Sequence, residues 1–452
     1  MTLDILRGFQ GIGAAATIPA SLGILAHAFP PSRTRNVAFS TFAAGAPLGA
    51  ALGMALGGVL TQETVMSWRS PFYLETGLTF LCLIGGLISF DPDQPSTEPD
   101  KRVDWIGAFL VTAGLVLIVF VLGQGEIAPE GWKTPYIIAL LITGVLLVIL
   151  FLLWQSHLEQ LQDHSLFSNL DDEPKGYHSN READKPAGTS ARSWLTPPPL
   201  MKVSLWRRAK GRFAIMMAIA FLTWCSFLSW NFWAQLYYQD YMGYSPVQTV
   251  LRLLPMFVSG VICNILVAAV VDYAPVLYLI VIGTAGTSLA SLLFAVINPN
   301  TVYWAFGFPG AVVAVIGADF VFASGTLFIA KVAEPHEQSL AGALFQTMTQ
   351  VSRLSPPSHG GSTGVALLNV VTRQQAATGW GSETLPPLES YQAAQWGAFA
   401  FGVLATLLAI IFFRGVGVVG ERKVTAYDDD SKQEKSTTVS SPDLEDSKQI
   451  SN

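Results

Sequence analysis

Long apolar stretches separated by short polar connections run along most of the chain. A helix needs about 20 mostly apolar residues to cross a bilayer, and eleven stretches meet or nearly meet this requirement. They lie at residues 8–28, 37–60, 71–90, 104–123, 134–154, 213–234, 248–271, 275–297, 303–328, 340–371 and 394–414. The stretch at 340–371 is the weakest, because SRLSPPSHGGSTG interrupts it. The pattern predicts an all-α polytopic membrane protein with about 11 transmembrane helices.

Two polar regions break this pattern, at residues 155–211 and 420–452. They lack the apolar side chains that offset the entropy cost of ordering a chain, so we expect both to be disordered. Basic residues gather in alternate connections, for example in WRRAKGR at 206–212. Because cytoplasmic connections carry the excess of Lys and Arg, we place both polar regions and the C-terminus in the cytoplasm.

The composition supports a bilayer protein and argues against an enzyme. Charged residues make up 13% of the chain, against about 25% in a soluble protein. Neither HExxH nor the P-loop lysine motif occurs in the chain. Three cysteines, all in apolar stretches, indicate neither a disulfide framework nor a metal site. We therefore expect no enzymatic activity, no cofactor, no metal and no nucleic-acid partner.

Polar residues inside the apolar stretches are the candidates for function, because they are costly at membrane depth. Arg7 and Gln10 are three residues apart and share a helix face. Asp319 lies mid-stretch in VIGADFVFASG without a cation nearby in sequence, which suits reversible protonation. Two plainer interpretations stay open: Arg7 extends to the interface, and Asp319 is hydrogen-bonded for packing alone.

Other candidates lie close to the outer ends of the stretches. Glu75 and Arg252 are either interfacial residues or part of a transport pathway. The aromatic run WNFWAQLYYQDY at 230–241 is either an interfacial belt or the lining of a site for an apolar ligand.

Glycines recur at every fourth residue in GAPLGAALGMALGG, which spans residues 45–58. Small residues let helices approach closely in lipid. We therefore expect a close-packed seam against a neighbouring helix, formed by Gly45, Gly49, Gly53, Gly57 and Gly58. A second smooth surface contains Gly11 and Gly13.

Several of these runs resemble motifs of one transporter family. LDILRGFQGIGAA (3–15) resembles the fourth-helix motif of the major facilitator drug:proton antiporters. GAALGMALGG (49–58) resembles their fifth-helix antiporter motif, with Met54 in place of the proline. SWRSPFYLE (67–75) resembles the run that opens their sixth helix. VDWIGAFL, YYQDYMGYSPVQTVLRLLP and GADFVFASGTLFI are similar to the fourteen-span branch, and particularly to its fungal aminotriazole- and boron-resistance type.

The resemblance implies a major facilitator fold, N-terminally truncated, whose stretches correspond to helices 4–14. Its parts would be residues 1–90 (remainder of the N-terminal bundle), 104–154 (two extra linker helices), 155–211 (disordered loop), 212–415 (C-terminal bundle) and 420–452 (disordered tail). In this interpretation Arg7, Gln10, Asp319, Arg252 and Glu75 belong to the proton or substrate pathway, and the glycines are packing residues.

The implied function is a proton-coupled efflux antiporter of small toxic organic or weakly acidic compounds. Its partners would be that substrate, protons and the lipid bilayer. We expect a monomer in the plasma membrane, with the vacuolar membrane as the alternative. Two other functions stay open: a truncated remnant that does not transport, and uptake of a nutrient or ion by the same fold.

Overall fold

The computed structural model of the chain is almost entirely helical where it is described, at residues 2–29, 33–89, 102–125, 128–171, 197–271, 273–334, 337–351 and 388–417. The helices are α1 (Thr2–Ala28), α2 (Arg33–Glu63), α3 (Ser70–Ser89), α4 (Trp105–Gln124), α5 (Pro135–Asp171), α6 (Arg212–Leu236), α7 (Pro246–Val270), α8 (Val276–Ala295), α9 (Tyr303–Val332), α10 (Gln338–Val351) and α12 (Leu388–Phe412). The predicted all-α fold is confirmed.

Nine helices among the described residues are long and apolar enough to cross a bilayer, against about 11 expected. The stretch at 37–60 forms the 31-residue helix α2, which is not one of these nine. The stretch at 340–371 forms α10 up to Val351. The rest of that stretch lies outside the described residues.

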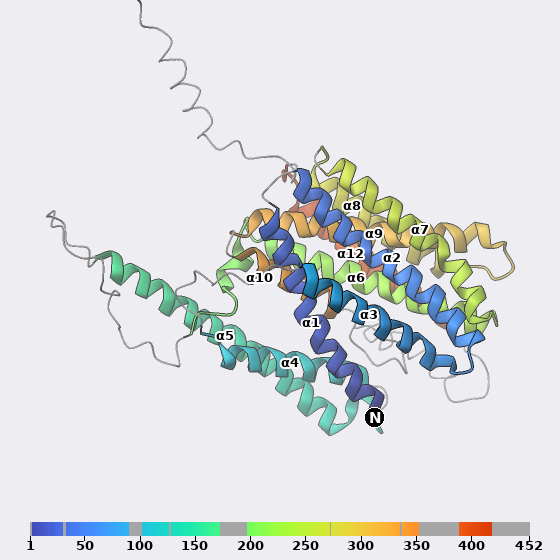
Figure 1. Cartoon of the computed structure of the whole chain (residues 1–452), viewed down its shortest axis with the longest axis horizontal. Helices are drawn as coiled ribbons and strands as arrows, with labels where there is room; N and C mark the ends of the chain where they lie inside the picture. Colours follow the sequence, from blue (N-terminus) through green and yellow to red (C-terminus); the bar gives the residue numbers. More distant parts are fainter. Residues whose placement is uncertain are drawn as a thin grey trace, which may run out of the picture.

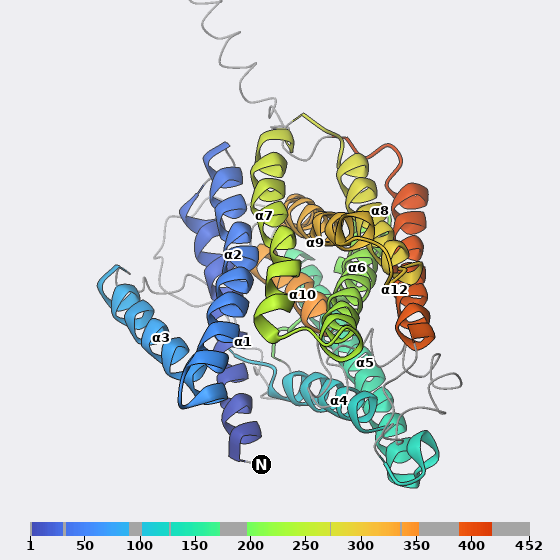
Figure 2. The ribbon, with the colours of Figure 1, turned by 90° about the vertical axis from the view of Figure 1, so that its right-hand side faces the viewer.

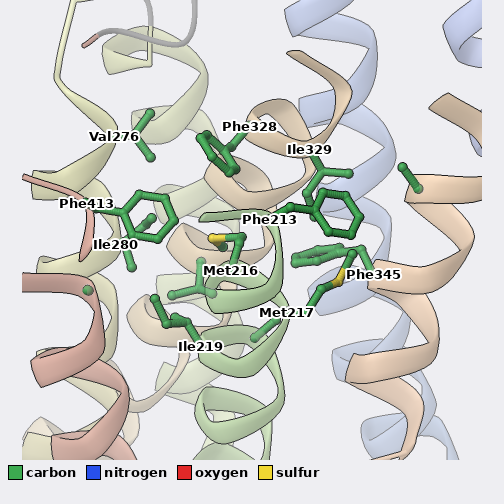
Figure 3. Close-up of a cluster of buried hydrophobic side chains, with 14 of the residues drawn as sticks. Phe213, Met216, Met217, Ile219, Val276, Ile280, Phe328, Ile329, Phe345 and Phe413 are labelled. Atoms are coloured by element: carbon green, nitrogen blue, oxygen red, sulfur yellow. The ribbon is translucent and has the colours of Figure 1, made fainter. Parts of the chain in front are cut away.

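Helices α6, α8, α9 and α12 form the main packed bundle, and α7 and α10 pack against it (Figure 1). Figure 3 shows a core in which α6, α8, α9 and α10 each contribute side chains: Phe213, Met216, Ile280, Phe328 and Phe345. Phe413 belongs to the same core, and its ring centroid lies 5.2 Å from that of Phe328. Helices in lipid gain no hydrophobic free energy from association, so such interlocking contacts hold the bundle together.

The closest helix approach in this bundle is between α8 and α9. A Cβ atom at Gly317 would overlap the Thr287 side chain and lie 2.6 Å from the carbonyl oxygen of Gly283. Thr287 Oγ1 in turn donates to the carbonyl of Ala314 at 3.5 Å. Small residues thus form a close-packed seam between α8 and α9.

The seam predicted on α2 is not formed in the described structure. A Cβ atom at Gly45, Gly49, Gly53 or Gly57 would meet no atom within 4 Å, and the same holds for Gly11 and Gly13 on α1. Helix α2 does lie beside α7 (Figure 2), but Met54 and Gly58 face the C-terminal helices. Gly58 would bring a Cβ to 3.6 Å from Val250, an ordinary contact. Because one residue turns a helix by about 100°, Met54 points to the neighbour and Gly53 does not.

Helices α4 and α5 form a hairpin that extends away from the main bundle (Figure 1). Its base is a buried polar cluster, in which Gln155 donates to Asp104 at 2.6 Å and accepts from the Met201 backbone at 3.1 Å. Glu159 accepts from the Val203 backbone at 2.9 Å. The expectation of disorder over 155–211 is therefore too broad. Residues 155–171 belong to α5, and residues 197–211 are held against it and against α6, while 172–196 lie outside the described residues, as does the tail 420–452.

Candidate functional site

Arg7, Gln10 and Glu75 form one hydrogen-bonded chain across α1 and α3. Arg7 Nη1 donates to Gln10 Oε1 at 2.5 Å, and Gln10 Nε2 donates to Glu75 Oε1 at 2.5 Å. The guanidinium of Arg7 also stacks on the ring of Phe72, with Cζ 4.6 Å from the ring centroid. Spacing along the sequence predicted that Arg7 and Gln10 share a face. The fold adds Glu75, which is 65 residues from Gln10.

An open cavity of about 410 Å³ adjoins this chain. Its polar lining comes from Gln10, Glu75, Thr76 and Thr79, and its apolar lining from Phe72, Phe80 and Leu83. All three members of the hydrogen-bonded chain are exposed in the described structure.

Asp319 does not belong to the Arg7–Gln10–Glu75 chain. It lies in a polar seam between α7 and α9. The seam contains Ser259, Cys263 and Asn264 of α7; Ser259 donates to the carbonyl of Val312 at 2.8 Å, and the side chain of Asn264 interacts with the Asp319 carboxyl group. Asp319 Oδ2 is buried and has no hydrogen-bond partner within the described residues. No ion pair of the described structure includes Asp319.

Arg252 lies in a third place, inside a cage of tyrosine rings at the start of α7. Its Cζ is 3.9 Å from the ring centroid of Tyr244, 5.7 Å from that of Tyr303 and 6.0 Å from that of Tyr238. The Tyr303 hydroxyl also donates to the backbone carbonyl of Arg252 at 2.6 Å. Since Asp319 is 16 residues beyond Tyr303 on α9, it lies about 24 Å farther along the axis. The five predicted pathway residues therefore occupy three separate places.

The aromatic run at 230–241 is largely internal to the bundle. Trp230, Trp233, Tyr237 and Tyr238 are 0–7% exposed. They pack around Phe294 of α8 and Tyr391 of α12, with the rings of Trp230 and Phe294 5.4 Å apart. This side of α6 thus points into the protein, and an interfacial belt does not describe these four side chains. The spacing of 230, 233 and 237 is the helical signal for such a buried stripe.

The other side of α6 carries two carboxamides that sequence reasoning missed. Gln235 Nε2 donates to Asn231 Oδ1 at 3.3 Å. Asn231 Nδ2 lies 3.6 Å from the sulfur of Met256 on α7, and Gln235 Nε2 lies 4.0 Å from the sulfur of Met54 on α2. Two amides four residues apart in an apolar helix are the signal that would have found them.

Comparison with known proteins identifies the family to which this chain belongs. The family model described as Major Facilitator Superfamily matches residues 2–124 and 96–357. The multidrug transporter mfsC of Aspergillus fumigatus is 24% identical over 92% of this chain and 70% of its own length. The low affinity ammonium transporter of Saccharomyces cerevisiae is 25% identical over 77% of this chain and 60% of its own length. The aminotriazole resistance protein of Saccharomyces cerevisiae is 32% identical over 33% of this chain and 28% of its own length.

These matches agree with the helical architecture and with the motifs of α1, α2 and α3. The chain spans 60 to 70% of the length of the multidrug transporter mfsC and of the low affinity ammonium transporter. The resemblance to the drug-efflux branch is confirmed, because relatives of that branch match most of the chain. The chain is an integral membrane protein that belongs to the major facilitator superfamily of transporters.

Proposed function

We propose that this protein is a proton-coupled antiporter that exports small toxic organic or weakly acidic compounds. Its partners are the exported compound, protons and the bilayer. It acts as a monomer in the plasma membrane, with its C-terminus in the cytoplasm. Protons moving down their gradient alternate with substrate moving out, as the two helix bundles rock about a site between them.

The observation that supports proton coupling best is the position of Asp319. It is a carboxyl group in the middle of a 30-residue spanning helix, with one buried oxygen that has no partner among the described residues. Ionisable groups at membrane depth are costly and mark proton or substrate routes. Asn264 beside it accommodates the carboxyl group in either protonation state, because an amide both donates and accepts.

The Arg7–Gln10–Glu75 chain is the second part of the proposal. It links a cation on α1 to a carboxylate on α3 through one amide. A conformational change that separates α1 from α3 would break this chain of hydrogen bonds, so the chain stabilises the conformation in which the two helices are together. A transporter needs such differential interactions to favour one conformation over another.

Uptake of a nutrient or ion is the alternative that one observation favours. A relative that matches 77% of the chain is named as a low affinity ammonium transporter, whereas the relative mfsC is named as a multidrug transporter. The two functions require opposite coupling: export exchanges substrate for protons, and uptake moves both in the same direction.

The test is flux in proteoliposomes that contain the purified chain. Aminotriazole is a first probe, because one relative is named for resistance to it. Antiport predicts that a proton gradient with an acidic lumen drives the probe inward and that the probe discharges the gradient, seen with an acid-accumulating dye. Accumulation driven by an alkaline lumen would instead establish symport. Absence of flux for a broad panel of compounds, from a chain that unfolds cooperatively, would favour a non-transporting remnant.

Gln10→Leu tests the hydrogen-bonded chain between α1 and α3. The variant removes the amide that joins Arg7 to Glu75, so we expect gradient-driven flux to fall at least about fivefold, the lower end of usual coupling free energies. The side chain is exposed, so the free energy of unfolding should change by about 0.5 kcal/mol or less. Gln62→Leu is the matched control: it removes an exposed amide on α2 whose hydrogen bond among the described residues is to its neighbour Glu63. Equal flux in both variants would exclude the role of Gln10.

A further inference from the structure

The two carboxamides on α6, Asn231 and Gln235, lie on a partly buried stripe of that helix, beside its fully buried side. Phe227, Asn231 and Gln235 recur every fourth residue and are all partly buried. On the other side, Trp230 and Ala234 are fully buried against the bundle. The stripe contacts helices of both halves of the chain: Met256 of α7 and Met54 of α2. It therefore lies where the N-terminal and C-terminal helices meet.

The hydrogen-bonding capacity of these amides is mostly unused within the described residues. Ordinary N–H···O bonds measure about 2.7–3.2 Å, and the Gln235–Asn231 bond is longer, at 3.3 Å. Their remaining contacts are to thioether sulfurs, which are weak acceptors. Gln235 Oε1 accepts no hydrogen bond from a described residue. Polar groups held this loosely gain free energy when a stronger partner replaces the sulfur.

The surroundings determine what kind of partner fits. Neither amide is hydrogen-bonded to a charged side chain among the described residues. The neighbouring groups are the thioethers of Met54 and Met256 and the ring of Phe227, which are apolar and adapt to ligand shape. A site with apolar walls and a few polar groups is typical of small-molecule recognition. A net charge on the ligand would find no compensating charge here.

We propose that Asn231 and Gln235 form a substrate subsite for uncharged, planar small molecules that carry a hydrogen-bond donor and an acceptor side by side, as amides and azoles do. Met54 and Met256 form its walls. The subsite rests on the proposed transport function and narrows its substrate class from toxic or weakly acidic compounds in general to their neutral forms. It also gives Met54, which stands where the antiporter motif has proline, a contact with the opposite bundle.

Four probes built on one ring test this chemistry. Benzamide is neutral and carries donor and acceptor together, benzoate is an anion, benzylammonium is a cation, and toluene has no hydrogen-bonding group. Binding of each radiolabelled probe is measured by equilibrium dialysis against the chain in lipid nanodiscs, without a pH gradient. We expect benzamide to bind more tightly than the two charged probes.

Asn231→Leu and Gln235→Leu keep the side-chain volume nearly constant. Each should weaken benzamide binding about tenfold, the loss typical of one hydrogen bond, and leave toluene binding unchanged. Asn300→Leu, in the exposed turn between α8 and α9, is the matched control and should change neither. Because toluene also partitions into lipid, the uptake of each probe by protein-free nanodiscs is subtracted. A variant that merely unfolds would then lose the protein-bound part of both probes, so the ratio of benzamide to toluene binding is the decisive quantity.

Several outcomes would overturn the proposal. Tighter binding of benzoate or benzylammonium would contradict a neutral ligand. Equal loss of benzamide and toluene in the Asn231 and Gln235 variants, or no saturable benzamide binding by a folded chain, would exclude the subsite. Because no gradient is applied, a failure of proton coupling elsewhere leaves this measurement intact, and the two proposals fail independently.

Discussion

Asp319→Asn is expected to abolish gradient-driven accumulation of substrate while leaving exchange of substrate for substrate intact. Asparagine has the shape of a permanently protonated aspartate but carries no titratable proton. A coupling free energy of about 1–3 kcal/mol between two ligands changes the affinity for each of them about 5- to 150-fold. We expect the variant to lose this effect of protons on the substrate. The seam with Asn264 keeps a hydrogen-bonding partner, so the helices should stay packed. The measurement compares accumulation under a pH gradient with counterflow at equal pH on both sides.

Asp240→Asn is the matched control for this experiment. Asp240 is an exposed carboxylate in the π-helical turn Tyr237–Tyr241 at the end of α6, so the same chemical change there should leave both kinds of flux near the wild-type level. Normal accumulation by the Asp319→Asn variant would remove Asp319 from the proton pathway. Loss of counterflow together with accumulation would assign it to substrate binding instead.

The spans were predictable from the sequence because the bilayer sets their length. Helices α4, α6, α8 and α9 begin within one residue of the predicted starts, since Pro, Asp or Gly breaks the apolar pattern there. The predicted stretch at 37–60 likewise lies inside a helix, α2 (Arg33–Glu63). Helix α5 continues beyond its apolar part to Asp171, and sequence reasoning missed this because it equated a polar composition with disorder.

The contacts between spans were predictable only where the partners are close in sequence. Arg7 and Gln10 lie on one helix turn and bond as their spacing indicates. Glu75 reaches the same chain from another helix, and no pattern within either segment specifies that pairing. The same holds for Asn264 beside Asp319 and for the tyrosine cage of Arg252, in which the ring of Tyr303 on α9 joins those of Tyr238 and Tyr244.

The glycines show a second limit of sequence reasoning. A small-residue stripe identifies a face that permits close approach, but it does not say whether a partner occupies that face. Gly53 and Gly317 both lie in helical small-residue runs, yet only Gly317 has backbone and side-chain atoms of another helix against it in the described structure. Which face meets a neighbour depends on the rotation of each helix, and that is fixed by packing of the whole bundle.

Gly317→Ala and Gly53→Ala should therefore change stability in opposite directions. Alanine is more favourable than glycine in a helix by about 1 kcal/mol, and the Cβ at Gly53 enters open space, so Gly53→Ala should be neutral or slightly stabilising. The Cβ at Gly317 would overlap Thr287 and approach the Gly283 carbonyl. Overpacking of this kind costs about 1–3 kcal/mol, which exceeds the gain in helix propensity.

Thermal unfolding of the two variants in detergent micelles measures this difference directly. The double variant Gly317→Ala with Thr287→Ala identifies its cause: it removes the Thr287 hydroxyl, the atom closest to the added Cβ, so part of the lost stability should return. The Thr287 Cβ, at 2.7 Å, remains. The contact with the Gly283 carbonyl is backbone and should keep the recovery incomplete. If Gly317→Ala were as stable as Gly53→Ala, α8 and α9 would not approach as closely as the described structure shows, and the seam that holds the C-terminal bundle would have to lie elsewhere.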